Sequence, residues 1–199
     1  MKTLRHGVTL FAVILWLLSG HDSVAAQATP PQTVVPAVLN TPPIPGDDTL
    51  RARIKVCLST GDLACIVTQW TTLKATDKVP EWLSAFQNAF DAANRRAGHC
   101  VRVAKSIHEG LTRLGERPEY LRITLMGEYR KNLGFDEIVN GVFVKNYQVA
   151  TNGYHVAVRL NGKIIDAYTG LAGLPEEEYI RRLVPYPGMR ILTEITESP

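Results

Sequence analysis

The chain has 199 residues, of which 45% are hydrophobic and 21% are charged. These proportions are close to globular averages and exclude a collagen-like, a coiled-coil and a fully disordered protein. The formal net charge of +3 is too small to indicate a nucleic acid or an anionic membrane as a partner.

The N-terminal segment has the pattern of a secretory signal peptide. Lys2 and Arg5 precede an apolar run over residues 8–18, and small residues follow up to Ala26. The run is too short to cross a bilayer, which needs about 20 apolar residues. We therefore expect residues 1–26 to be removed by cleavage after Ala26, leaving a secreted or periplasmic protein without a stable membrane span.

A proline-rich stretch without hydrophobic periodicity follows, over residues 27–47. Such a composition buries too little surface to offset the entropy lost on ordering, so it predicts a disordered linker. The remaining residues, roughly 150 in number, have the size of one domain.

Apolar residues recur at helical spacing through the next segment, residues 48–97, and just beyond it. The predicted helices begin at Asp48, at Leu63, at Pro80 and at Cys100. The third is expected to turn Leu83, Phe86, Phe90 and Ala93 inward before Gly98 stops it, and the fourth to run to Leu114. Cys100 is therefore expected at the N-terminus of a helix.

After Pro118 the pattern changes to alternation with many β-branched residues, which predicts strands of one antiparallel sheet. These strands are Tyr120–Leu125, Val142–Val149, Tyr154–Leu160, Lys163–Tyr168 and Met189–Ile195. A short helix is expected to begin at Pro175. Helices followed by strands predict an α+β fold with the helices on one face of the sheet, in which residues 48–97 pack with a catalytic region, residues 98–199, as one unit.

Three cysteines in an exported protein raise the question of which thiol stays free. Cys57 and Cys65 flank a tight turn at Gly61 on helices that must run antiparallel, so they are the pair most easily joined. In that case Cys100 is the free thiol. The alternative is that all three are buried apolar residues without a disulfide, and the sequence leaves both arrangements open.

An Asn-Gly pair at residues 161–162 joins two alternating strands and predicts a two-residue hairpin turn. The register of such a turn places His155 across from Tyr168. It also places Ala157 across from Asp166, which makes His155 and Asp166 diagonal neighbours on one face. At that separation an aspartate side chain reaches an imidazole nitrogen, whereas a shift of one residue would put the two on opposite faces.

Cys100, His155 and Asp166 together are the parts of an activated thiol nucleophile. A helix dipole and an imidazolium partner both favour the thiolate. In the implied mechanism His155 takes the thiol proton, Cys100 attacks a carbonyl carbon, and the imidazolium protonates the leaving amine or ammonia. Asp166 holds the imidazole in the correct tautomer.

Two further histidines are considered as the base. His99 directly precedes Cys100 and is a rival, but neighbouring side chains at a helix start diverge. His108 lies two turns further along the predicted helix and is expected to face solvent. We therefore favour His155.

The oxyanion of such a reaction needs hydrogen-bond donors. The backbone N–H of Cys100 supplies one, and Gln87 and Asn94 are the side chains considered for the second. Arg95 and Arg96 are interpreted as cations that match the dipole at the end of the third helix.

Four stretches together resemble a known family. They are Gly98-His99-Cys100, Thr151-Asn152-Gly153-Tyr154-His155-Val156-Ala157-Val158, Asn161-Gly162-Lys163-Ile164-Ile165-Asp166 and Gly173-Leu174-Pro175. Over roughly residues 98–185 they resemble the papain-fold toxin domains of bacterial polymorphic toxin systems, in particular the second type. The resemblance implies a papain-like fold and a catalytic triad of Cys100, His155 and Asp166.

The resulting prediction is an exported papain-like thiol hydrolase that acts on amide bonds of a protein or peptide, as a peptidase or a glutamine deamidase. The resemblance also suggests a role as a toxin, with an immunity or inhibitor protein as a partner. Transfer of the same acyl group to an amine would make the enzyme a transglutaminase. No cofactor is expected, and a metal site built on Cys100 and His155 lacks further ligands at suitable spacing.

A second class of function is a non-catalytic binding module. In that case residues 48–97 form a helical adaptor and the papain-like part is a scaffold. Burial of Cys100, or its pairing with Cys57 or Cys65, would favour this alternative.

Overall fold

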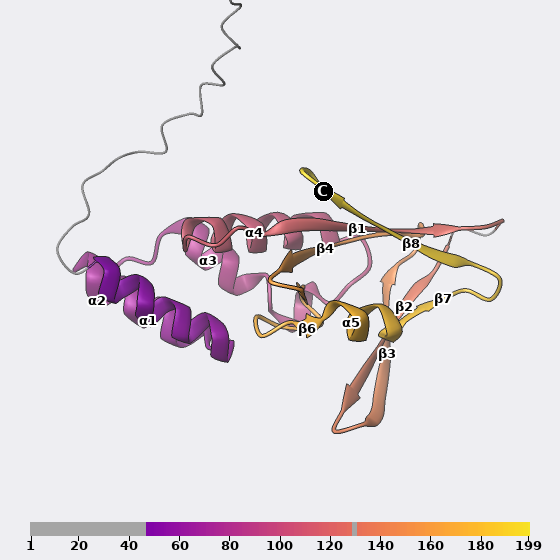
Figure 1. Cartoon of the computed structure of the whole chain (residues 1–199), viewed down its shortest axis with the longest axis horizontal. Coiled ribbons are helices and arrows are strands. Elements are labelled where there is room, and N and C mark those ends of the chain that lie inside the picture. Colours follow the sequence, from indigo (N-terminus) through magenta and orange to yellow (C-terminus); the bar gives the residue numbers. More distant parts are fainter. Residues whose placement is uncertain (1–46, 129–130) are drawn as a thin grey trace, which may run out of the picture. The chain divides into compact units, whose positions relative to one another are not determined.

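A computed structural model describes residues 47–128 and 131–199, so the predicted signal peptide and nearly all of the predicted linker lie outside the described residues. The elements are α1 (Asp47–Thr60), α2 (Leu63–Lys74), α3 (Glu81–Asn88), η1 (Ala92–Asn94), α4 (Cys100–Arg113), β1 (Glu119–Met126), β2 (Leu133–Val139), β3 (Val142–Ala150), β4 (Tyr154–Leu160), β5 (Lys163–Ile165), β6 (Leu174–Pro175), α5 (Glu176–Arg182), β7 (Leu183–Pro185) and β8 (Arg190–Thr196) (Figure 1). The α+β class is confirmed.

The strands form two sheets, and the prediction of a single sheet is wrong. One sheet has the order β6-β5-β4-β1-β8 and the other β3-β2-β7, with antiparallel pairing throughout. β2 was not foreseen because Gly134, Asp136 and Glu137 weaken its strand pattern. β2 pairs with β3, and the hairpin of these two strands projects from the rest of the fold (Figure 1).

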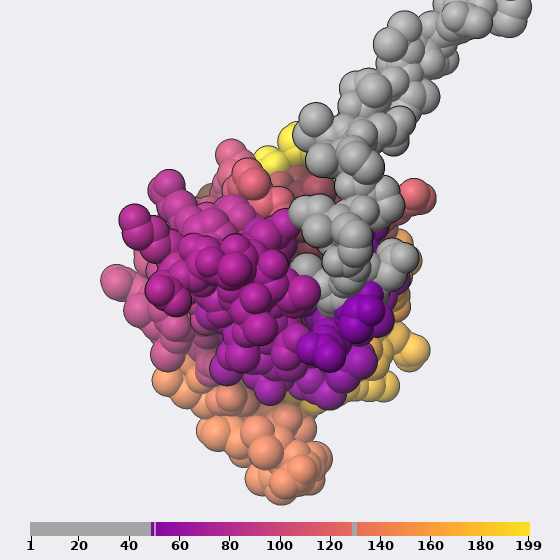
Figure 2. Space-filling model, turned by 90° about the vertical axis from the view of Figure 1, so that its left-hand side faces the viewer, coloured from indigo at the N-terminus to yellow at the C-terminus, as the bar shows by residue number. Residues whose placement is uncertain are grey.

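One face of the five-stranded sheet is covered by α1–α4. The buried side of α4 packs against Val156 and Val158 of β4, in an apolar cluster that also takes in Ile54, Ile66 and Phe86 from the first three helices. Figure 2 shows α1 and α2, in indigo and purple, over much of the side that faces the viewer. The predicted packing of these four helices on one face is therefore found.

The opposite face is also covered. Alternate residues of β1 and β4, among them Ile123 and Ala157, pack with Phe135 of β2 and Tyr179 of α5 in a second buried cluster. The sequence predicts helices on one face only, whereas α5 packs on the other face. Because His155 shares this side of β4 with Ala157, it is enclosed rather than solvated.

The third helix is shorter than predicted. α3 ends at Asn88, and Asp91 has the extended angles φ −63° and ψ 144°, which interrupt the helix before a 3-10 turn. Ala93 is exposed instead of facing inward. Arg95 and Arg96 therefore lie in a loop and do not match a helix dipole, so that interpretation is wrong.

Cys57 and Cys65 form a disulfide, with their Cα atoms 5.6 Å apart. It joins α1 to α2 across the turn at Gly61, which has φ 70° and leaves no room for a side chain beside Ala172. The question left open by the sequence is thereby answered, since Cys100 is free and buried.

No helix in the described ranges is both long and apolar enough to cross a membrane.

Candidate active site

Cys100 is the first residue of α4, which runs for 14 residues. Gly98, at φ 85°, turns the chain immediately before it. Val103, Ala104 and Ile107 are buried on the side of α4 that packs on β4, so the helix is fixed to the sheet. The thiol is therefore held by a rigid element at a helix N-terminus, where the dipole favours a negative charge.

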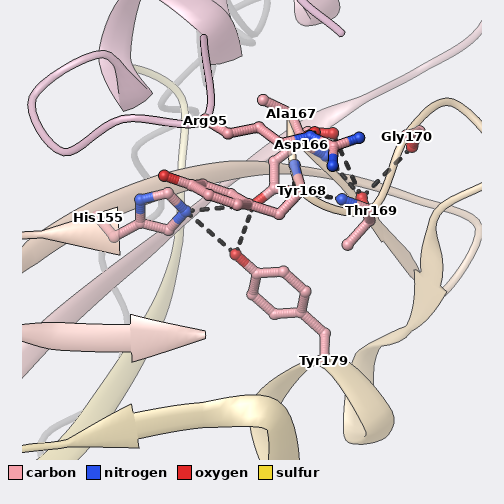
Figure 3. Close-up of polar contacts among 8 residues, drawn as sticks. All are labelled: Arg95, His155, Asp166, Ala167, Tyr168, Thr169, Gly170 and Tyr179. Carbon is pink, nitrogen blue, oxygen red and sulfur yellow. Dashed lines mark hydrogen bonds and ion pairs between the residues drawn. The ribbon is translucent and has the colours of Figure 1, made fainter. Parts of the chain in front are cut away.

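His155 and Asp166 meet, as the hairpin register predicts. The Nε2 atom of His155 lies 3.3 Å from Oδ2 of Asp166, and the two residues are 1% and 2% exposed. Tyr179 of α5 completes the group: its hydroxyl donates to the same Oδ2 at 2.7 Å and lies 3.1 Å from Nε2 (Figure 3). These contacts fix the orientation of the imidazole ring.

The position of Asp166 results from a turn that ends β5. Its Oδ1 accepts the backbone N–H groups of Tyr168 at 2.8 Å and Thr169 at 2.9 Å, and its own N–H donates to the Thr169 hydroxyl at 2.9 Å. The register up to Ile165 is the predicted one. The strand does not continue to Tyr168, because side-chain bonds of this kind favour a turn over a ladder.

Electrostatics stabilise a charged histidine. Burial alone would lower the pKa of His155, but the hydrogen bond to Asp166, the interaction with Cys100 and the attraction of both negative charges raise it to about 9. Burial alone would raise the pKa of Asp166, but the bonds and charge of His155, with the Tyr179 hydroxyl and the Thr169 N–H, hold it below its usual range.

The same interactions favour a thiolate. Burial alone would raise the pKa of the Cys100 thiol, but its interaction with the His155 imidazole, the attraction between their charges, and the backbone at Val156 and Val101 outweigh burial and lower the pKa. At neutral pH His155 therefore keeps its proton, and the equilibrium of Cys100 is shifted towards the thiolate.

The two nitrogens of the His155 imidazole have different surroundings. Nε2 is bound to Asp166 and Tyr179, whereas Nδ1 is buried and has no hydrogen-bond partner among the described residues. Figure 3 shows Nδ1 on the ring edge that points away from these two partners. Nδ1 is thus the nitrogen available for the proton of Cys100.

Cys100, His155 and Asp166 line one small cavity of about 10 Å³. Its remaining lining residues are Asn94, Arg96, Val103, Val156, Ala167 and Tyr168. This volume holds roughly one water molecule, so a substrate enters only if lining residues move apart. A larger hollow of about 380 Å³ lies between α1, α4 and the β4–β5 turn, but its lining has no cysteine or histidine, so the chemistry assigns the site to the smaller cavity.

The two other histidines considered as bases point elsewhere. The Nδ1 of His99 lies 3.1 Å from the guanidinium of Arg102. His108 stacks on Tyr120 with ring centroids 4.3 Å apart and is half-buried, so it faces solvent only in part. Neither lines the cavity of Cys100.

The residues proposed as oxyanion donors do not fit that role. Asn94 lines the cavity, but its amide nitrogen donates to the Asn88 carbonyl at 2.5 Å and its oxygen accepts from Arg102 at 2.7 Å. Gln87 is not among the cavity residues. Nearby, Arg95 donates to the Ala167 carbonyl at 3.0 Å and so links the loop before α4 to the Asp166 turn.

Tyr179 is the site residue that sequence reasoning missed altogether. It is fully buried and bound to Asp166, yet in the sequence it stands within a charged stretch, Glu176–Arg182, with no motif around it. Only the packing of α5 against the far face of the sheet brings it to the histidine.

Comparison of the chain with protein-family models, with curated proteins and with solved structures finds no significant match. The function is therefore argued from the geometry of the site.

Proposed function

We propose that this chain is an exported papain-like thiol hydrolase that acts on amide bonds of a protein or peptide, with Cys100 as nucleophile, His155 as base and acid, and Asp166 as the residue that orients the histidine. The observation that carries the proposal is that one imidazole nitrogen of His155 is hydrogen-bonded and the other is not. Nε2 is bound by Asp166, Nδ1 is unbonded among the described residues, and His155 lines the same cavity as a thiol whose pKa is lowered.

The first half-reaction follows from this arrangement. The Cys100 thiolate attacks the amide carbonyl carbon, so a C–S bond forms and the carbonyl π electrons move to oxygen. When the carbonyl re-forms, the C–N bond breaks and the His155 imidazolium gives its proton to the leaving nitrogen. The products are a thioester on Cys100, neutral His155, and an amine, or ammonia from a glutamine side chain.

The second half-reaction regenerates the Cys100 thiolate and the His155 imidazolium. His155 takes a proton from water, the hydroxide attacks the thioester carbon, and the C–S bond breaks to release the carboxylic acid. Asp166 keeps its charge throughout and stabilises the imidazolium each time it forms. An amine in place of water would give a new amide, which is the transglutaminase form of the same chemistry.

Peptidase, deamidase and transglutaminase activities share this acyl-enzyme. The likeness of the sequence to papain-fold toxin domains supports a bacterial toxin or effector role and an immunity protein as a partner, and both belong to the proposal.

The proposal is tested by the pH dependence of alkylation by iodoacetamide. Because Cys57 and Cys65 are joined, Cys100 is the reagent's single thiol target. We expect a midpoint well below about 8.5, the value of a free cysteine, and a rise towards that value in His155→Gln. The same measurement on urea-unfolded protein supplies the reference.

Two observations favour the non-catalytic binding module, namely the burial of Cys100, which is 9% exposed, and the small volume around it. A thiol that reacts with iodoacetamide only after unfolding would support that alternative and would overturn the hydrolase. A native thiol with an ordinary midpoint, unchanged in His155→Gln, would overturn it as well.

A further inference from the structure

A second polar group in the cavity has no partner. The hydroxyl oxygen of Tyr168 is buried and forms no hydrogen bond within the described residues, although Tyr168 lines the cavity together with Cys100. Its ring lies 6.3 Å from the His155 ring, and Figure 3 shows the hydroxyl on the side of the imidazole that carries Nδ1. The phenol therefore points to the place where the thiol would react.

The ring of Tyr168 is held from several sides. Its backbone N–H donates to Asp166, and its ring packs against Tyr147 and Phe135, with centroids 5.4 Å and 5.8 Å away. The carboxylate that orients His155 thus also fixes the backbone of Tyr168. Base and phenol are positioned by one side chain.

The phenol is a donor over the working pH range. Burial raises the pKa of Tyr168, and the charges of Asp166 and Cys100 raise it further. The group therefore keeps its proton. A buried O–H without an acceptor is unfavourable, so an acceptor is expected when the cavity is occupied.

We propose that the Tyr168 hydroxyl is the side-chain oxyanion donor of this site, a role that rests on the proposed hydrolase function. Attack by Cys100 turns the substrate carbonyl oxygen into an oxyanion next to the sulfur. The first backbone N–H groups of α4 have no partner within the helix and provide one donor. The Tyr168 O–H provides the other, and it strengthens as charge develops on oxygen.

This assignment takes the place of Asn94 and Gln87. One N–H of the Asn94 amide already donates to the Asn88 carbonyl and its oxygen accepts from Arg102, and Gln87 does not line the cavity. Among the described residues that line the cavity, Tyr168 is distinguished by a buried hydroxyl donor without a partner.

The test compares two reagents for the same thiol. Iodoacetamide is attacked at its CH₂ carbon, a C–S bond forms and iodide leaves, so no oxyanion arises. p-Nitrophenyl acetate is attacked at the carbonyl carbon, an oxyanion forms, and p-nitrophenolate leaves as the acetyl group is bound to Cys100. Acetylation, but not alkylation, therefore needs the donor.

We expect Tyr168→Phe to slow acetylation at least about tenfold and to leave the alkylation rate and its pH midpoint unchanged. Loss of one donor costs about 100-fold in acyl-transfer enzymes, and the good leaving group of this ester reduces the effect. Tyr147→Phe is the matched control, because its hydroxyl bonds Arg95 and Glu137 rather than pointing into the cavity. We expect it to change neither rate.

The outcomes separate this inference from the proposed function. Unchanged acetylation in Tyr168→Phe would overturn the donor assignment, and equal losses in both tyrosine variants would assign the effect to ring packing. A parallel loss of acetylation and alkylation would show that Tyr168 acts on the Cys100–His155 pair and would also overturn the assignment. A wild-type thiol inert to iodoacetamide would overturn the hydrolase itself.

Discussion

The two faces of the five-stranded sheet are buried in different ways. On the helical face, α1–α4 enclose an apolar cluster that contains the Cys57–Cys65 disulfide. On the other face, β2 and α5 enclose apolar residues together with the bonded group of His155, Asp166 and Tyr179. Both faces therefore bury apolar residues, and the second also buries charge.

Because of this difference, substitutions on the two faces should affect different properties of the protein. Apolar burial is favourable in proportion to area, whereas a buried charge is tolerated only when it is paired and hydrogen-bonded. Substitutions on the helical face should lower the free energy of unfolding and leave the properties of Cys100 intact. Substitutions around His155 should change the pKa of Cys100, and those that break the buried charge pair should lower stability as well.

The largest loss of stability is expected from Phe86→Ala. Phe86 is fully buried on the helical face, packs against Phe90 at 5.5 Å and lies where a side chain at Gly110 would clash. We expect the free energy of unfolding to fall by about 3–5 kcal/mol, measured by urea titration with tryptophan fluorescence. The alkylation midpoint of Cys100 in the folded fraction should not move.

Phe143→Ala is the matched control for this substitution. Phe143 is 59% exposed in the projecting β2–β3 hairpin, so the same change in side chain should cost less than about 0.5 kcal/mol. Equal losses from the two variants would contradict the assignment of stability to the helical core.

A smaller loss is expected from removal of the disulfide. The bond closes a short loop between α1 and α2, so the double variant Cys57→Ala, Cys65→Ala should lose about 2–3 kcal/mol. Because neither cysteine lines the cavity of Cys100, alkylation of Cys100 should keep its midpoint. A shifted midpoint would show that the two faces are coupled through α4.

Much of the helical face could be predicted from the sequence. Apolar residues at helical spacing mark α1, α2 and α4, and Asn161-Gly162 sets the register that brings His155 to Asp166. These signals are local, since each depends on residues within a few turns or one hairpin. The end of α3 was wrong because Phe90, although apolar, lies beyond the helix and packs back on Phe86.

The other face depends on contacts that no local pattern records. β2 is interrupted by polar residues, and Tyr179 reaches Asp166 only because α5 folds back over the sheet. The hairpin register predicts Tyr168 across from His155. In the structure the strand ends in a turn at Asp166 instead, and Tyr168 lines the cavity with a buried hydroxyl that has no partner among the described residues. The approach of His155 to Asp166 was therefore predictable, and the contact of Tyr179 with them was not.

The smallest expected effect, and the one specific to the face that buries charge, is the loss of stability in acid. The pKa of Asp166 is lower in the folded chain than its usual 3.8, so below that pH the unfolded chain binds a proton that the folded chain does not. Stability is then present above pH 3.8 and is lost as the pH falls through the folded pKa, at up to about 1.4 kcal/mol per pH unit. Urea titrations of wild type and Asp166→Asn between pH 5 and 2 should show a shallower decline in the variant, because the variant has no carboxylate at this position to protonate. In the wild type His155 is protonated in both the folded and the unfolded chain over this range and adds nothing to the slope. Equal slopes would contradict the view that this face buries a carboxylate stabilised by His155 and Tyr179.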